Sequence, residues 1–277
     1  MKDTVRNLKE AAITKRSGDS LKNGKKAREE NQSVRRALDV LDVLAGSSEP
    51  IGVRELARTL GFAPSIAQRL LITLANAGYV ERKGVGSRYV IGFKSFQVGN
   101  TFITQNSFLS LVMPELESLA NLDITGFVGV LRQSIVVYLA TVQGNGPIAV
   151  KRQLGSVTHP HSTALGKALL SEYSDAEVID LLPPTLPQLT KNTTVSLDDL
   201  LAELAQIRKK GYALNDQENR IGVFSVGAVI RDASGATVGA LSGAVPSSSL
   251  NSKSQKRIIG LVVESANRVS QRLGWRG

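Results

Sequence analysis

The feature that most constrains this chain is a pair of short helical segments separated by a tight turn, close to its N-terminus. The first segment spans residues 52–60 and is closed by Gly61, because glycine suits the left-handed conformation that ends many helices. The second begins near Pro64, a residue suited to the first helical turn, and stops at Gly78. Two short helices joined by a glycine-containing turn predict a helix-turn-helix.

The segments on either side complete a recognisable unit. Before it, apolar residues recur at helical spacing over about 33–45. After it, two β-like runs, 79–82 and 88–91, bracket a glycine-rich tip and predict a β-hairpin, or wing. The pair Gly84 and Gly86 lacks the third glycine and the strand-then-helix context of a dinucleotide loop, so it favours a turn.

The positive charge of the chain is concentrated in the same region. Residues 1–100 hold 18 of the 34 Lys and Arg residues but only 10 of the 24 Asp and Glu residues. A local basic excess is typical of a nucleic-acid contact, because cations that displace counterions from phosphate give affinity for any sequence; a merely solvated face is the alternative. Residues 1–30 have little to bury, so we expect a flexible basic arm there.

Composition bounds the rest of the molecule. With 277 residues, 42% of them hydrophobic, the chain is long enough for two domains. It has no cysteine, which excludes disulfides and thiolate metal sites. No apolar run is long enough to span a bilayer, and the charged N-terminus is unlike a signal peptide. We expect a cytoplasmic protein without a membrane partner.

The second half of the chain predicts an α+β domain in which helices cover one antiparallel sheet. The expected strands are 127–131, 135–142, 148–150, 223–231 and 237–245, and the expected helices are 109–122, 163–173, 197–210 and 250–273. The expected parts are an arm (1–30), a winged helix-turn-helix domain (31–93), a linker helix (94–108) and an effector-binding and oligomerisation domain (109–277).

Several short motifs, taken in order, resemble the IclR family of regulators from about residue 32 to 274. In the first domain they include Gln32-Ser33-Val34, Glu55-Leu56-Ala57, Arg69-Leu70-Leu71 and Gly78-Tyr79-Val80; in the second they are the run 161–168, the run 207–212 and Asp216-x-Glu218. The resemblance implies a GAF-like effector domain joined by the linker helix to the winged domain. It also implies dimers or tetramers that bind double-stranded promoter DNA and respond to a small organic acid or related metabolite.

The second of the two short helices is the expected recognition helix, which enters the major groove by its N-terminal side. Its outward polar residues are Ser65, Gln68, Arg69 and Thr73. The Gln68 amide suits adenine, whereas Arg69 suits guanine, a phosphate or an acid in its own domain. In the wing, Arg82, Lys83 and Arg88 are candidates for phosphate or minor-groove contacts, with a plain solvated hairpin as the alternative. Ser33 is a candidate to offer a backbone amide to a phosphate.

A second candidate site surrounds the start of the helix expected near residue 163. With Ser162 or Thr163 as N-cap, the amides of Ala164, Leu165 and Gly166 form an anion site that suits a carboxylate; an ordinary capped helix is the alternative. The family resemblance adds polar contacts from Asn215, Ser225 and Ser242, within an apolar wall that includes Phe127 and Leu131. Gly129 lies between those two apolar residues and leaves room for a ligand, or marks a bulge.

We expect no catalytic residue, no cofactor and no metal site. His159 and His161 are the only histidines, and neither lies in a triad or a metal motif. Ser225 stands where the family often carries a cysteine, and Ala244 where some members carry a serine, so the ligand's identity does not transfer. Two alternatives stay open: an enzyme with an appended helix-turn-helix, and an architectural DNA-binding protein without an effector.

Overall fold

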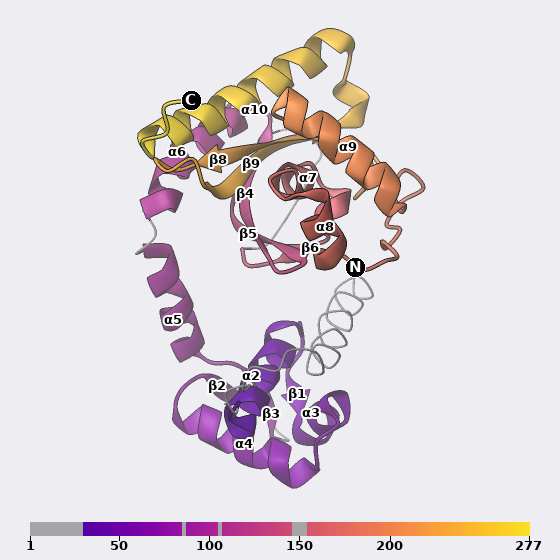
Figure 1. Ribbon diagram of the computed structural model, residues 1–277. Helices are drawn as coiled ribbons and strands as arrows, with labels where there is room; N and C mark the ends of the chain where they lie inside the picture. The colour runs from indigo at the N-terminus through magenta and orange to yellow at the C-terminus, as the bar shows by residue number, and fades with distance from the viewer. Residues whose placement is uncertain (1–29, 85–86, 105–106, 146–153) are drawn as a thin grey trace. The chain divides into compact units, whose positions relative to one another are not determined.

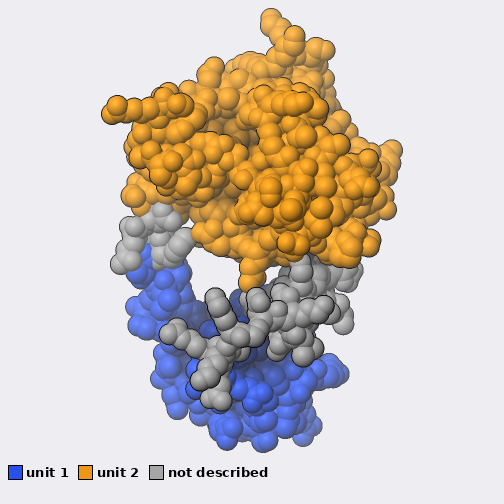
Figure 2. Space-filling model, in the orientation of Figure 1, with its two compact units in different colours: residues 1–106 blue, residues 107–277 orange. Residues whose placement is uncertain are grey.

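The computed structural model describes residues 30–84, 87–104, 107–145 and 154–277, and the chain divides into two compact units, 1–106 and 107–277 (Figures 1 and 2). The expected arm lies outside the described residues except for Glu30, and the expected strand 148–150 lies outside them entirely. Each unit has a core of its own, so each is described by itself.

The first unit is a winged helix-turn-helix, as the sequence predicts. Its elements are α2 (Gln32–Ala45), β1 (Ile51–Gly52), α3 (Val53–Leu60), α4 (Pro64–Asn76), β2 (Val80–Lys83), β3 (Arg88–Ile91) and α5 (Phe93–Thr104). The three strands pair in the order β1-β3-β2. Gly61, at φ +67°, ends α3 in the left-handed conformation. Pro64 begins α4.

The wing is held against the end of α4 by a close approach of two backbone segments. The Gly92 amide donates to the Tyr79 carbonyl at 2.8 Å. A Cβ atom at Gly92 would lie 2.4 Å from the Gly78 carbonyl oxygen, closer than such atoms come. Only glycine therefore fits at the junction between the wing and α5.

The second unit contains one six-stranded antiparallel sheet with the order β6-β5-β4-β9-β8-β7. Its strands are β4 (Thr125–Arg132), β5 (Ile135–Val142), β6 (Val157–Thr158), β7 (Ala213–Asp216), β8 (Val223–Arg231) and β9 (Thr237–Pro246). Its α-helices are α6 (Ser107–Ala120), α7 (Ala164–Leu170), α8 (Asp175–Leu181), α9 (Leu197–Lys210) and α10 (Ser252–Arg272). The expected α+β architecture is confirmed.

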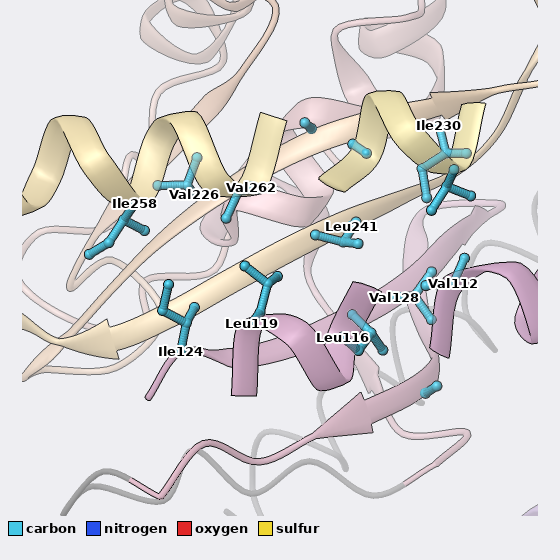
Figure 3. Close-up of a cluster of buried hydrophobic side chains, with 14 of the residues drawn as sticks. Val112, Leu116, Leu119, Ile124, Val128, Val226, Ile230, Leu241, Ile258 and Val262 are labelled. Atoms are coloured by element: carbon cyan, nitrogen blue, oxygen red, sulfur yellow. The ribbon is translucent and has the colours of Figure 1, made fainter. Parts of the chain in front are cut away.

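Helices cover both faces of this sheet and create two cores. On one face, α6 and α10 bury Val112, Leu116 and Val262 against Val128 and Leu241 (Figure 3). The other face packs against α7, α8 and α9, whose buried residues form a separate apolar cluster. None of the helices within the described ranges has the length and apolar character needed to cross a bilayer.

Candidate functional site

The predicted recognition helix, α4, presents the expected polar residues to solvent. Ala67 and Leu71 are fully buried, whereas Ser65, Gln68, Arg69 and Thr73 are all exposed. The Thr73 hydroxyl donates to the Arg69 carbonyl at 3.0 Å, so it is partly engaged within its own helix. The remaining polar surface of α4 is free to meet a ligand.

Gln68 and Arg69 carry the strongest recognition chemistry on this face. Over the described residues, neither side chain has a hydrogen bond or ion pair, so Arg69 does not pair there with an acid of its own domain. The Gln68 amide can donate to N7 and accept from the N6 amino group of adenine, and the Arg69 guanidinium can donate to both N7 and O6 of guanine. The helix therefore has the chemistry of a base-reading surface.

The three basic residues of the wing differ in the hydrogen bonds and ion pairs that they form within the domain. Arg88 donates to the Pro50 carbonyl at 2.6 Å and lies 3.8 Å from Glu55, so it ties the wing to the start of α3. Arg82 hydrogen-bonds to the Ser87 hydroxyl across the hairpin. Lys83 is exposed and unpaired among the described residues, which leaves it the most available cation of the three.

The amide of Ser33 is engaged within its own helix. The Asn31 side chain caps α2 by accepting from the amides of Ser33 at 3.0 Å and Val34 at 3.2 Å. A phosphate at this end of α2 would have to compete with that cap. The expected phosphate contact from Ser33 is correspondingly weakened.

Two arginines on α3 were missed by the sequence analysis. Arg54 and Arg58 lie one helical turn apart, are exposed, and have no acidic partner within the described residues. The first helix of a helix-turn-helix crosses the DNA backbone, where such cations meet phosphate. Their spacing of four residues, which places both on one helix face, was the available signal.

In the second unit, the structure gathers the predicted pocket residues on one face of the sheet, beneath α7. Phe127 on β4 is opposite Ser242 on β9, and Ser225 on β8 is opposite Asn215 on β7. A Cβ at Gly227, which is opposite Ser242, would lie 2.4 Å from the Ala164 carbonyl oxygen. This close contact places the start of α7 directly against the sheet.

The start of α7 is packed more tightly than the sequence suggested. Thr163 is the N-cap, and its hydroxyl accepts from the Gly166 amide at 3.0 Å. A Cβ at Gly166 would lie 2.3 Å from the Pro160 carbonyl oxygen, so the glycine admits the Pro160 backbone rather than a ligand. The Gly166 amide, one of the three expected to form the anion site, is therefore already engaged by the N-cap.

The space expected beside Gly129 is also filled by the protein. The β4–β5 register shifts between Val128 and Gly129, which marks a bulge. A Cβ at Gly129 would lie 2.7 Å from the Val137 carbonyl oxygen and 3.3 Å from Leu165. Of the two alternatives for Gly129, the geometry fits the bulge.

The polar side chains on this sheet face are not all satisfied by the protein. Asn215 is buried and donates to the Ser162 carbonyl. The hydroxyls of Ser225 and Ser242 have no hydrogen-bond partner among the described residues, although Ser242 is only 4% exposed. Ser225 is half-buried, and neither hydroxyl is among the fully enclosed, unpartnered atoms of the described residues, so both can be reached by a ligand or by ordered water.

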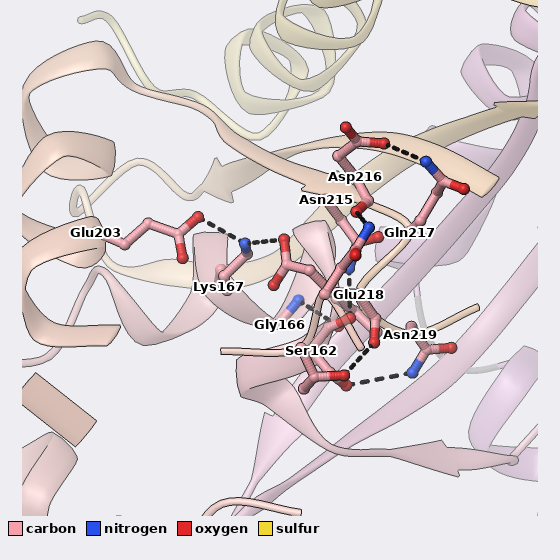
Figure 4. Close-up of polar contacts among 12 residues, drawn as sticks. Ser162, Gly166, Lys167, Glu203, Asn215, Asp216, Gln217, Glu218 and Asn219 are labelled. Atoms are coloured by element: carbon pink, nitrogen blue, oxygen red, sulfur yellow. Dashed lines mark hydrogen bonds and ion pairs between the residues drawn. The ribbon is translucent and has the colours of Figure 1, made fainter. Parts of the chain in front are cut away.

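A charged network adjoins this face (Figure 4). Lys167 on α7 is fully buried, and its Nζ lies 2.6 Å from Glu203 on α9 and 2.7 Å from Glu218. Glu218 Oε2 is buried and has no partner in the described part of the chain. Burial raises the pKa of the Glu218 carboxyl, while Lys167 acts in the opposite direction. The network ties the start of α7 to α9 and to the loop after β7.

Both histidines precede α7, with His159 just before the short 3-10 helix η2 (Pro160–Ser162) and His161 within it. His161 Nε2 donates to the Pro187 carbonyl at 3.0 Å, and the His161 ring centroid lies 5.5 Å from that of His159. Burial, with a smaller contribution from His161, lowers the pKa of His159 to about 4. Among the described residues, no group of three or more His, Asp or Glu side chains is arranged to hold a metal ion.

Comparison with known proteins identifies the family. Residues 33–84 match the IclR helix-turn-helix domain, and residues 103–271 match the family described as bacterial transcriptional regulator IclR C-terminal. The chain belongs to the IclR family of DNA-binding transcriptional regulators. It is 30% identical over 247 residues to the acetate operon repressor of Salmonella typhimurium, which covers 88% of this chain and 90% of that protein.

Solved structures agree with this assignment. The IclR protein of Thermotoga maritima matches with a TM-score of 0.69 and 26% identity, covering 88% of this chain and 98% of that one. An IclR homologue of Microbacterium hydrocarbonoxydans, complexed with 4-hydroxybenzoate, matches with a TM-score of 0.76, covering 87% and 99%. At 17% identity, the second likeness shows the fold alone.

Proposed function

We propose that this regulator binds promoter DNA as a cytoplasmic homo-oligomer, and that a small organic acid or related metabolite modulates that binding. The observation that carries the effector half of the proposal is the pair of unpartnered hydroxyls, Ser225 and Ser242, on the sheet face beneath α7. Phe127 and Leu131 supply apolar wall on the same face. A few polar groups within an apolar surface are typical of small-molecule sites.

The chemistry of the effector follows from these groups. Hydroxyls and the amides at the start of α7, with the positive end of the helix dipole, favour an acceptor such as a carboxylate. The related protein of Microbacterium hydrocarbonoxydans was solved with 4-hydroxybenzoate, which is an acid of this class. Because Gly166 already contacts Pro160 and Thr163, and the Ala164 carbonyl and Leu165 amide pack against Gly227, the ligand would approach through the two serines.

The DNA half of the proposal rests on the exposed, unpaired Gln68 and Arg69 and on the cations around them. A symmetric dimer would present two recognition helices to an approximate inverted repeat, with half-sites about 34 Å apart or a multiple of that distance. Selection from a random DNA library, followed by footprinting, tests this arrangement. Protection of a single asymmetric site by a monomer would contradict it.

The effector is tested by a thermal-shift screen of organic and aromatic acids, followed by calorimetry on each acid that raises Tm. Ser242→Ala should weaken binding by about 0.5–1.5 kcal/mol because it removes one hydrogen bond. Ser249→Ala is the matched control, since Ser249 lies in an exposed turn. Turnover of a hit would support the enzyme alternative, and the absence of any hit would support an architectural protein.

A further inference from the structure

We propose that the second unit has another ligand site, distinct from the sheet face beneath the start of α7, that binds a carboxylate with an apolar body. The site is a pocket of about 420 Å³ at the opposite end of α7. Its walls come from the end of β4, the residues that close α7, and the hairpin between β8 and β9. Its volume lies within the range of about 300–1,000 Å³ that is usual for small-molecule sites.

This pocket is separate from the proposed effector site. Neither Ser225 nor Ser242 lines it, and Leu131 is the single residue of the proposed effector site that does. Binding in this pocket is therefore independent of whether an effector binds beneath the start of α7.

Two charged residues that line the pocket, Glu172 and Arg231, form an ion pair with each other. Arg231 contacts both oxygens of Glu172, at 2.8 Å to Oε1 and 2.6 Å to Oε2. The Thr237 hydroxyl donates to Glu172 Oε2 at 2.7 Å. Because the Glu172 carboxylate is already engaged by Arg231 and Thr237, its charge is compensated and it is a poor site for a cation.

The other charged residue of the pocket is Arg132, which forms no ion pair among the described residues. Arg132 is exposed, and its one hydrogen bond goes to the carbonyl of the preceding residue, Leu131, at 3.0 Å. No acid among the described residues pairs with Arg132, so most of its guanidinium donors are free. Tyr173, which also lines the pocket, adds a hydroxyl without a partner in the described residues. A planar guanidinium with free donors matches a carboxylate in bidentate geometry.

The apolar residues of the wall indicate the chemistry of the part of the ligand that does not contact Arg132. Val130, Leu131 and Leu169 are buried, and Val238 is half-buried, so a small apolar area lies within a wall that is otherwise mainly polar and includes Arg132. An acid without an apolar body would leave that side unfilled. A cation would meet Arg132 with repulsion. The combination favours compact aromatic or branched monocarboxylates.

Calorimetric titration of the full chain with benzoate, and with benzamide as the uncharged counterpart, tests the site. We expect benzoate to bind, benzamide to bind at least about tenfold more weakly, and Arg132→Gln to weaken benzoate by at least about tenfold, as the loss of a charge-assisted contact predicts. Ala236→Trp, at an exposed lining position, should weaken it similarly by filling the pocket.

Two variants serve as controls, and circular dichroism checks that every variant folds. Arg257→Gln removes an exposed arginine on α10, which does not line the pocket, and should leave benzoate binding within about twofold. Benzoate also belongs to the class of acids proposed for the effector site, so Ser242→Ala separates the two sites: it should weaken benzoate binding beneath the start of α7 and leave binding at Arg132 within about twofold. Benzoate binding that is lost in Ser242→Ala but retained in Arg132→Gln and Ala236→Trp would overturn the second site, as would the absence of saturable benzoate binding.

Discussion

Replacement of Lys167 by methionine should destabilise the second unit strongly, and more at neutral than at acidic pH. Lys167 is fully buried between Glu203 and Glu218, whose side chains are 33% and 12% exposed. Removal of one partner from a buried ion pair leaves an uncompensated charge and costs about 3–5 kcal/mol. We therefore expect a loss of that order in the free energy of unfolding near neutral pH.

The pH dependence has a definite sign. Burial raises the pKa of Glu218, and Lys167 opposes this rise. Without Lys167, Glu218 takes up a proton more readily in the folded protein, and burial of the neutral carboxyl costs much less free energy than burial of the carboxylate. A carboxyl with a raised folded pKa stabilises the protein below that pKa and loses this contribution as pH rises through it. The loss caused by Lys167→Met should therefore be smaller near pH 5 than near pH 8.

Urea unfolding followed by circular dichroism at both pH values measures this difference. Lys209→Met, an exposed position on α9, is the matched control and should change stability by less than about 0.5 kcal/mol. Adding Glu218→Gln to Lys167→Met should restore part of the stability at about pH 8, because it removes the buried negative charge. Equal losses at the two pH values, or a loss below about 1 kcal/mol, would refute the reasoning.

Three further predictions concern the DNA surface and the histidines. Gln68→Ala and Arg69→Ala should each lower discrimination between operator and random DNA by about 1–3 kcal/mol with the fold intact, which fluorescence anisotropy measures; unchanged discrimination in both would show that another element reads the sequence. Arg54→Ala and Arg58→Ala should weaken binding to all sequences alike and each reduce the slope of log affinity against log salt by about 1; an unaltered slope would remove α3 from the interface. The His159 imidazole, with its pKa lowered to about 4, should stay neutral at pH 5 in an NMR titration. Because the unfolded imidazole takes up its proton near its ordinary pKa of 6.5, His159 should cost stability as pH falls from there toward 4, and His159→Gln should flatten that dependence.

The first unit was predictable from the sequence because its signals are local. Gly61, Pro64 and the apolar spacing of α4 each act within a few residues, and the structure has α4 where they place it. Strand β1 was missed because Ile51 and Gly52 are too short a run to show a period. Its pairing with β3 is a contact over long sequence distance.

The second unit was predictable in its long elements and less so in its site. Strands β8 and β9 are long apolar runs and helix α9 has a helical period, whereas β6, β7 and α8 are short and were missed. The sequence placed small residues at 129 and 166 but did not reveal what fills the space beside them. The Val137 carbonyl and the Pro160 backbone fill it, and both contacts depend on tertiary packing.

Lys167 and Glu218 each lie in a motif of the sequence, but nothing in the sequence indicated that they form an ion pair. Glu203 and Glu218 are 36 and 51 residues away from Lys167 in the chain, and only the fold brings them together. In the sequence, Lys167 was simply a lysine on a short helix. Its burial is what distinguishes it, because lysine is almost never fully buried without a partner.

Effector-responsive DNA binding is tested most directly by the affinity for DNA with and without effector. For the selected operator, anisotropy titrations compare the free protein with protein saturated by the acid that raises Tm most. We expect saturation to change the DNA Kd by at least about fivefold, and Ser242→Ala to require more acid for the same change. An unchanged Kd at saturation, in a protein that binds both DNA and the acid, would contradict it.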